Sequence, residues 1–299
     1  MATPMLKSGE VTDDRVRALS NDASVTRSGG SAQMLQDLRG ALAEFFACAF
    51  FVYFGAGAVT GNFQANVEAS PDSKVPFPIE PINYATAFGL SITILAFAIG
   101  DLSGGHINPA VTAAMVISGN MKPLKGLIYA CAQIAGGLIG GGLLRAAVGA
   151  DQYHSGIGLS VEISANQGLL LEFMGTLLLL FVIFGTAVWG GDPKRTDLCG
   201  SVFSTLAPLP IGFSVLVIHL QLGPFTGCGI NHARVIGAVV WEVGFWESHA
   251  GRNFWIYMIG PLLASCVAPA MYFALYGTTK APMGKSGEAI DVANPNDRL

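Results

Sequence analysis

Two stretches of the sequence decide its fold: Ser103-Gly104-Gly105-His106-Ile107-Asn108-Pro109-Ala110-Val111 and Thr226-Gly227-Cys228-Gly229-Ile230-Asn231-His232-Ala233-Arg234. A glycine, Gly89 or Gly212, lies nineteen residues before the asparagine of each stretch. A serine, Ser91 or Ser214, lies seventeen residues before it. Such matched spacing indicates that one structural unit is written twice in this chain.

The composition indicates that lipid surrounds most of the chain. Of its 299 residues, 52% are hydrophobic and only 12% are charged, which is unusual for a soluble domain. A helix needs roughly 20 apolar residues to cross the hydrocarbon core of a bilayer. Glu44 and Glu172 are almost the only formal charges in the segments that meet this demand. These six predicted crossings are 41–60, 82–100, 126–144, 168–191, 200–222 and 253–279.

Each asparagine is followed by an apolar run, 109–118 or 232–240, that is too short to cross a bilayer. Irregular backbone is tolerated at membrane depth only where it is buried in protein or lines water. Three crossings in each half place the two halves in opposite orientations, as in many transport proteins. We therefore predict an all-α membrane protein with six transmembrane helices and two re-entrant half-helices in an inverted repeat. The half-helices should meet end to end inside the bundle.

The distribution of lysine and arginine predicts the domain boundaries and the orientation. Residues 1–37 and 279–299 are polar and are expected to be flexible cytoplasmic tails around a channel domain at 38–278. The first repeat covers about 38–147 and the second about 166–278. With a cytoplasmic N-terminus, twelve of the sixteen lysines and arginines lie on the cytoplasmic side. Both termini are therefore expected in the cytoplasm, although the sequence does not distinguish the plasma membrane from an internal one.

Several classes of function are disfavoured by the sequence. A net charge of −4 without a basic stripe argues against nucleic acid as a partner. The five cysteines lack the paired spacing of a zinc site or of a disulfide framework. We therefore expect no metal, no cofactor and no catalysis.

The two quoted stretches resemble the signature loops of the aquaporin, or major intrinsic protein, family. The similarity extends over about residues 38–278, and two signature loops at inverted-repeat positions are far more specific than one Asn-Pro-Ala. The resemblance implies a channel of the water-selective type, with water as its permeant and a homotetramer in the bilayer as its assembly.

The paired asparagines have a physical reason that is independent of the family. An asparagine at the start of a half-helix can cap that helix while its amide N–H points into a pore. Asn108 and Asn231 would each donate to the oxygen of one passing water molecule, which then cannot relay a proton. Two positive helix ends beside the pore would repel protons and cations. The alternative is that both residues are only helix caps.

A selectivity filter is implied by the resemblance. Phe88, His219, Cys228 and Arg234 match the aromatic/arginine constriction of water-selective relatives. Phe88 and His219 should leave room for water but not for a carbon chain, and Val235 replaces the aspartate that often follows the arginine in glycerol channels. Taken singly, the first three have ordinary packing explanations, whereas an arginine in an apolar half-helix indicates function.

Glu44 and Glu172 are expected to be structural. As in the family, each carboxylate could accept hydrogen bonds from the backbone of a re-entrant loop, with Gln133 assisting. The second motif also departs from the family, because His232 stands where proline is usual, between Asn231 and Ala233. His232 is either a tolerated packing variant or a site that alters conductance or responds to pH.

Other functions remain open at this point. A broader pore could carry glycerol, ammonia or hydrogen peroxide. An ion-coupled transporter could share the inverted repeat, although it should hold more ionisable groups at the centre of the membrane. A non-conducting junction protein could keep the same fold.

Overall fold

The computed structural model describes residues 13–69, 81–190, 202 and 204–277, and all regular secondary structure within them is helical. The predicted all-α class is therefore confirmed. The elements are α1 (Asp13–Ala69), α2 (Pro81–Ser103), α3 (Pro109–Ile117), α4 (Pro123–Val148), α5 (Ala165–Ile183), the π-helix η1 (Phe184–Val188), α7 (Pro208–Thr226), α8 (His232–Val239), α9 (His249–Arg252) and α10 (Trp255–Tyr276).

Six helices in the described part of the chain are long and apolar enough to cross a bilayer, as predicted. The fifth begins at Pro208, later than the expected residue 200, because proline lacks an N–H and suits the first turn of a helix. Residues 200, 201 and 203 lie outside the described part. The apolar spans are Ala32–Ala65, Pro81–Ser103, Pro123–Val148, Ala165–Val188, Pro208–Thr226 and Trp255–Tyr276.

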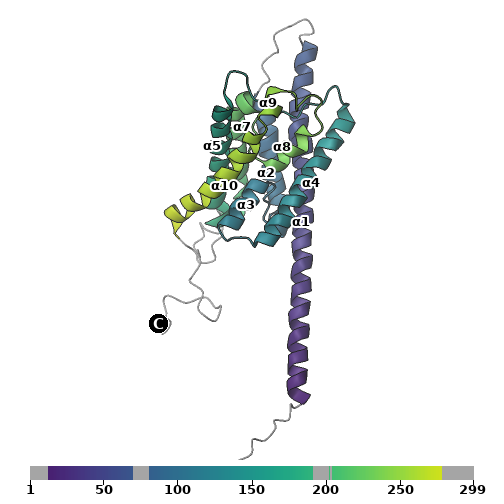
Figure 1. Ribbon diagram of the computed structural model, residues 1–299, viewed down its shortest axis with the longest axis vertical. Coiled ribbons are helices and arrows are strands. Elements are labelled where there is room, and N and C mark those ends of the chain that lie inside the picture. The colour runs from purple at the N-terminus through teal and green to yellow at the C-terminus, as the bar shows by residue number, and fades with distance from the viewer. Residues whose placement is uncertain (1–12, 70–80, 191–201, 203, 278–299) are drawn as a thin grey trace, which may run out of the picture.

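The N-terminal region differs from its prediction. Helix α1 begins at Asp13, so residues 13–37, which were expected to be a flexible tail, are helical. The N-terminal part of this segment extends beyond the bundle (Figure 1), whereas Asp37 forms an ion pair with Lys125 of α4 at 3.1 Å. No proline occurs between Pro4 and Pro71. A helix that is nucleated in the apolar span can therefore propagate toward the N-terminus, gaining one hydrogen bond for each residue added. Residues 1–12 and the predicted tail 279–299 lie outside the described residues.

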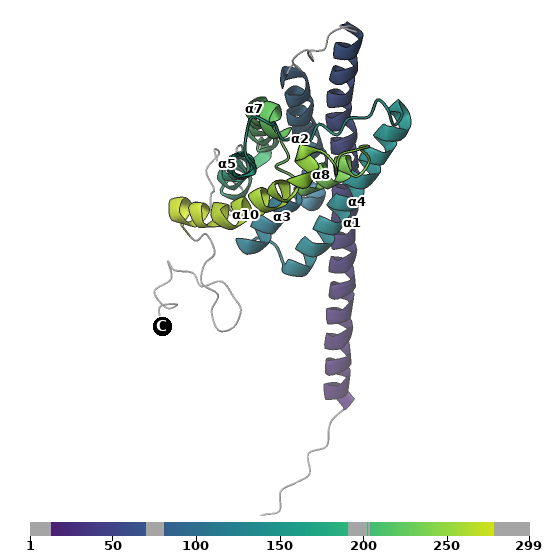
Figure 2. The ribbon, with the colours of Figure 1, turned by 45° about the horizontal axis from the view of Figure 1, so that its top comes forward.

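The helices pack in pairs that follow the repeat. Helix α1 packs against α4, α5 against α10, and α2 against α7 (Figures 1 and 2). The last pair joins equivalent helices of the two halves. Gly89 and Gly212 meet where they cross, and a Cβ added to Gly89 would lie 2.8 Å from the carbonyl oxygen of Gly212. The repeated glycines therefore let these two backbones approach closely.

The short runs after the two motifs form the half-helices α3 and α8, as predicted. Asn108 and Asn231 are their N-caps, and each side-chain oxygen accepts a backbone N–H of its own helix, from Ala110 and from Ala233 and Arg234 respectively. The starts of the half-helices are joined by hydrogen bonds across the repeat, which are described below. The inverted repeat with two half-helices meeting inside the bundle is therefore confirmed.

Candidate functional site

The first re-entrant loop is fixed by a buried carboxylate on α1. Glu44 accepts hydrogen bonds from the Ser103 hydroxyl at 2.6 Å and from the backbone N–H groups of His106 and Ile107 at 2.9 and 2.6 Å. The Gln133 amide also donates to it, at 2.7 Å. Because Ser103, His106 and Ile107 all donate to this one carboxylate, Glu44 restrains the loop at several points.

Glu172 on α5 does the same for the second loop. It accepts from the Thr226 hydroxyl at 2.6 Å and from the backbone N–H groups of Gly229 and Ile230 at 2.8 and 2.6 Å. Each partner stands at the repeat position of a partner of Glu44. Both carboxylates are 0% exposed, so the loop donors supply the solvation that water cannot.

The residue before each asparagine has an unusual backbone. Ile107 and Ile230 have φ values of 52° and 41°, in the left-handed region that β-branched residues rarely adopt. Such strain persists only where surrounding contacts enforce it, and here the glutamates hold both N–H groups. The Asn108 amide donates to the Ile230 carbonyl at 3.0 Å, and the Asn231 amide donates to the Ile107 carbonyl at 2.8 Å. The strained residues thus join the two half-helices.

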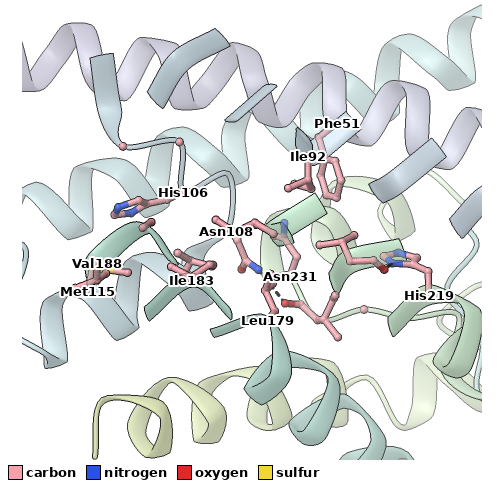
Figure 3. A pocket seen from close by; sticks show the side chains of 18 residues that line it. Phe51, Ile92, His106, Asn108, Met115, Leu179, Ile183, Val188, His219 and Asn231 are labelled. Atoms are coloured by element: carbon pink, nitrogen blue, oxygen red, sulfur yellow. Dashed lines mark hydrogen bonds between the residues drawn. The ribbon is translucent and has the colours of Figure 1, made fainter. Parts of the chain in front are cut away.

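Both asparagines line a cavity of about 210 Å³. Figure 3 shows Asn108 and Asn231 near its middle, with His106 toward one end and His219 toward the other. Each asparagine NH₂ group has two hydrogens, and one of them is used in the cross-repeat bond. The second N–H of each is therefore available to a molecule in the cavity. Most of the remaining wall is apolar and includes Phe51, Ile92, Val111, Met115, Leu179 and Ile183.

The predicted filter residues meet at the end of the cavity that His219 lines. The Phe88 ring stacks on His219, with centroids 4.4 Å apart and planes 21° apart. The guanidinium carbon of Arg234 lies over the Phe88 ring, 4.9 Å from its centroid. His219 lines the cavity, whereas Phe88, Cys228 and Arg234 do not. The structure therefore brings three of the four predicted residues into direct contact at one end of the cavity.

Two polar atoms at this end lack a protein partner. The Nδ1 of His219 lies 2.8 Å from the Val215 carbonyl oxygen. Because a carbonyl oxygen can only accept, Nδ1 carries the proton and donates it. In a neutral imidazole, Nε2 is then the acceptor. Arg234 donates to the carbonyls of Ser155 and Gly227 at 3.1 and 3.3 Å. The His219 Nε2 and the Arg234 Nε are buried and have no hydrogen-bond partner in the structure. Buried groups of this kind are usually satisfied by water.

Cys228 completes the predicted set of four. It is 0% exposed, has a φ of 58°, and its N–H donates to the Thr226 hydroxyl at 3.2 Å. The structure thus places Cys228 in the second re-entrant loop. Its neighbours in that loop are held on both sides, since the Gly229 N–H donates to Glu172 and the Gly227 carbonyl accepts from Arg234.

The loop between α4 and α5 contributes a contact that the sequence did not reveal. The Ser155 carbonyl holds Arg234, and the Gly158 and Ser160 N–H groups donate to the carbonyls of Thr226 and Phe225. A backbone carbonyl is present at every residue, so no residue type marks this role. Only the folded loop identifies Ser155.

His232 occupies the first position of α8. Its Nε2 bonds the Met258 carbonyl of α10 at 2.9 Å, and its buried Nδ1 has no hydrogen-bond partner. Met258 lies three residues before Pro261, a proline inside α10. Because Pro261 has no N–H, the helix hydrogen bonding is interrupted in this segment. His232 therefore ties the half-helix to a proline-containing segment of a neighbouring helix, which proline at this position could not do.

The site contains no arrangement suited to a metal. Within the described residues, no group of three or more His, Cys, Asp or Glu side chains is placed to hold an ion.

Known proteins resemble this chain in sequence and in fold. The family model for the major intrinsic protein matches residues 31–272. Aquaporin PIP2-5 of Zea mays is 35% identical over 254 residues, covering 83% of this chain and 86% of that protein. Aquaporin-4 of Rattus norvegicus is 38% identical over 233 residues, covering 77% of this chain and 65% of that protein.

A solved structure confirms the fold independently of close sequence similarity. The aquaglyceroporin from Plasmodium falciparum superposes with a TM-score of 0.63 at 19% identity, covering 80% of this chain and 96% of that one. The matched family model and the identity to aquaporins, together with the paired asparagine loops, lead to one assignment. This chain is an integral, multi-pass membrane protein and belongs to the major intrinsic protein family, the aquaporins.

Proposed function

We propose that this protein is a passive water channel that excludes protons and ions, with no cofactor and no catalytic step. The observation that carries the proposal is the pair of unpartnered atoms at the constriction, the Arg234 Nε and the His219 Nε2. One is a donor and the other an acceptor. A water molecule can satisfy both, because it accepts and donates hydrogen bonds at once.

The constriction discriminates by size and charge. Phe88 stacked on His219 forms a rigid aromatic wall, which leaves little space for a carbon chain. Arg234 is 1% exposed, and its guanidinium remains charged. A fixed positive charge in a site with little water raises the free energy of an entering cation. A cation that enters the ring therefore loses hydration water and meets no negatively charged group among these residues that would offset the cost.

The centre of the pore interrupts proton transfer. Asn108 and Asn231 each keep one amide N–H free for the cavity, beside the positive ends of α3 and α8. A water molecule that accepts from both amides must direct its own hydrogens away from them. Its neighbours on either side are then oriented in opposite directions, and the file cannot pass a proton.

The orientation and the assembly of the protein are inferred from its charged and its exposed apolar residues. We place both termini in the cytoplasm, because lysine and arginine concentrate on that side. The N-terminal part of α1 and the C-terminal end of α10 extend toward the same end of the bundle (Figure 1), in agreement with this placement. We also propose a homotetramer embedded in lipid, as the family resemblance implies. Exposed apolar residues on α1, among them Leu42, Phe46, Phe50 and Phe54, can face lipid or a neighbouring copy.

Proteoliposome shrinkage tests the proposal. Purified protein is reconstituted, and light scattering follows the response to sucrose and to glycerol gradients, with a pH dye reporting proton leak. We expect faster water efflux without faster glycerol or proton entry. Rapid glycerol entry would support a broader pore instead, proton-coupled solute uptake a transporter, and no change at all a non-conducting junction protein.

A further inference from the structure

The Phe88 ring is held from several directions. Phe51 contacts it edge-on, with centroids 5.3 Å apart and planes 67° apart, and His219 stacks on it. Arg234 lies over it at 4.9 Å. Phe51 belongs to α1, whereas the free nitrogens of His219 and Arg234 mark the side on which a solute passes. The ring therefore stands between α1 and the pore.

Gly55 forms the part of α1 against which the ring rests. A Cβ added to Gly55 would lie 2.7 Å from the Cζ of Phe88, and closer still to the Cε1 and Cδ1 atoms of the same ring. All three of the nearest atoms belong to Phe88. Glycine in a helix interior is less favourable than alanine, so this position gives up some helix stability. What it gains is a recess that the ring fills.

We infer that Gly55 is a specificity-determining residue of the channel, which acts through Phe88 and touches no solute. This inference deepens the proposed function and rests on it. By leaving room for the ring on α1, Gly55 sets how far Phe88 stands back from His219 and Arg234. The width of the constriction is then fixed by four filter side chains and by one missing side chain behind them.

The size of the effect follows from the contact distances. To restore an ordinary contact of 3.4 Å from the 2.7 Å at Cζ, the ring must move by more than about 0.7 Å. Phe51 blocks retreat along α1, so the ring moves toward His219 and Arg234. The shift is therefore more than about a quarter of the diameter of a water molecule, which is roughly 2.8 Å. In a single-file pore, such narrowing should strongly slow permeation.

The test compares three glycine-to-alanine variants of the full chain in proteoliposomes. Gly55→Ala should lower the osmotic water permeability per protein by about tenfold, which corresponds to about 1.4 kcal/mol of added barrier. Gly61→Ala is the matched control on the same helix, because nothing lies within 4 Å of its added Cβ. Gly40→Ala controls for a ring clash elsewhere, since its Cβ would meet the Tyr129 side chain. Both controls should keep the wild-type osmotic water permeability per protein.

A second variant keeps the inference testable if Gly55→Ala fails to fold. Phe88→Val removes the ring, so the double variant should fold and should match Phe88→Val alone in water permeability and in solute selectivity. A lasting effect of Gly55→Ala in that background, or a double variant that still fails to fold, would reject the role of the recess. So would conduction by Gly55→Ala equal to that of Gly61→Ala. A wild-type chain that conducts no water would reject the proposed function, and this inference with it.

Discussion

Replacing Glu172 by glutamine tests whether the buried carboxylates hold the pore in shape. Oε1 accepts from Thr226 and Gly229, and Oε2 accepts from Ile230. In Glu172→Gln, an amide NH₂ replaces one oxygen. If the remaining oxygen keeps its two donors, the NH₂ faces the N–H of Ile230, and two donors oppose each other.

The magnitude can be worked from these contacts. A hydrogen bond to a charged group contributes about 1.5–3 kcal/mol, and a neutral one about 1 kcal/mol. Losing the Ile230 bond and weakening the other two should together lower the free energy of unfolding by about 3–5 kcal/mol. The left-handed φ of 41° at Ile230 is strained and needs the surrounding contacts to hold it. The Ile230 carbonyl also accepts the hydrogen bond that positions Asn108. Release of its N–H should therefore disturb the asparagine and reduce water flux.

The assay combines thermal unfolding in detergent with water flux in proteoliposomes. Glu162→Gln is the matched control, since Glu162 is exposed on the loop before α5. Glu44→Gln should behave like Glu172→Gln, because Glu44 makes the equivalent bonds in the other half. If Glu172→Gln and Glu162→Gln unfold at the same temperature and conduct equally, the carboxylate does not support the loop and the reasoning is wrong.

Three further predictions concern the pore itself. His219→Gly combined with Phe88→Ala should admit glycerol, which is measured by swelling, and unchanged exclusion would remove both residues from the filter. Mercury should inhibit water flux through the thiol of Cys228, and Cys228→Ser should abolish most of that inhibition; an equally sensitive variant would locate the thiol elsewhere. His232→Pro should lose the bond to Met258 but keep selectivity, with wild-type flux flat between about pH 5 and pH 8. Acid inhibition that disappears in His232→Pro would show instead that His232 is a pH-dependent gate.

Much of the fold could be predicted because lipid imposes simple demands on a sequence. A crossing needs a long apolar run, and a polar asparagine between apolar runs must find partners inside the protein. Six runs and two asparagine loops therefore defined the helices and the inverted repeat. The length of α1 escaped this logic, because outside the membrane its residues are polar and no apolar pattern marks whether they are helical.

The site was harder to predict from the sequence, because several of its parts are backbone groups or empty space. The left-handed φ of Ile107 and Ile230 contradicts their residue type, so propensity alone would assign another conformation. The carbonyl of Ser155 that holds Arg234 carries no signature in the sequence. Gly55 is one of 38 glycines, and only the position of the Phe88 ring distinguishes it from the others.

The repeat also explains why the filter stands at one end of the cavity only. Moving each filter residue to the matching position of the other half replaces Arg234 by Val111 and His219 by Ala96. The same operation replaces Cys228 by Gly105 and Phe88 by Ile211. Three of these four counterparts, Gly105, Val111 and Ile211, line the open cavity. The two halves thus share one backbone, but one set of side chains leaves a mostly apolar wall and the other brings a charged group and aromatic rings together. We therefore propose that discrimination between solutes occurs at the ring.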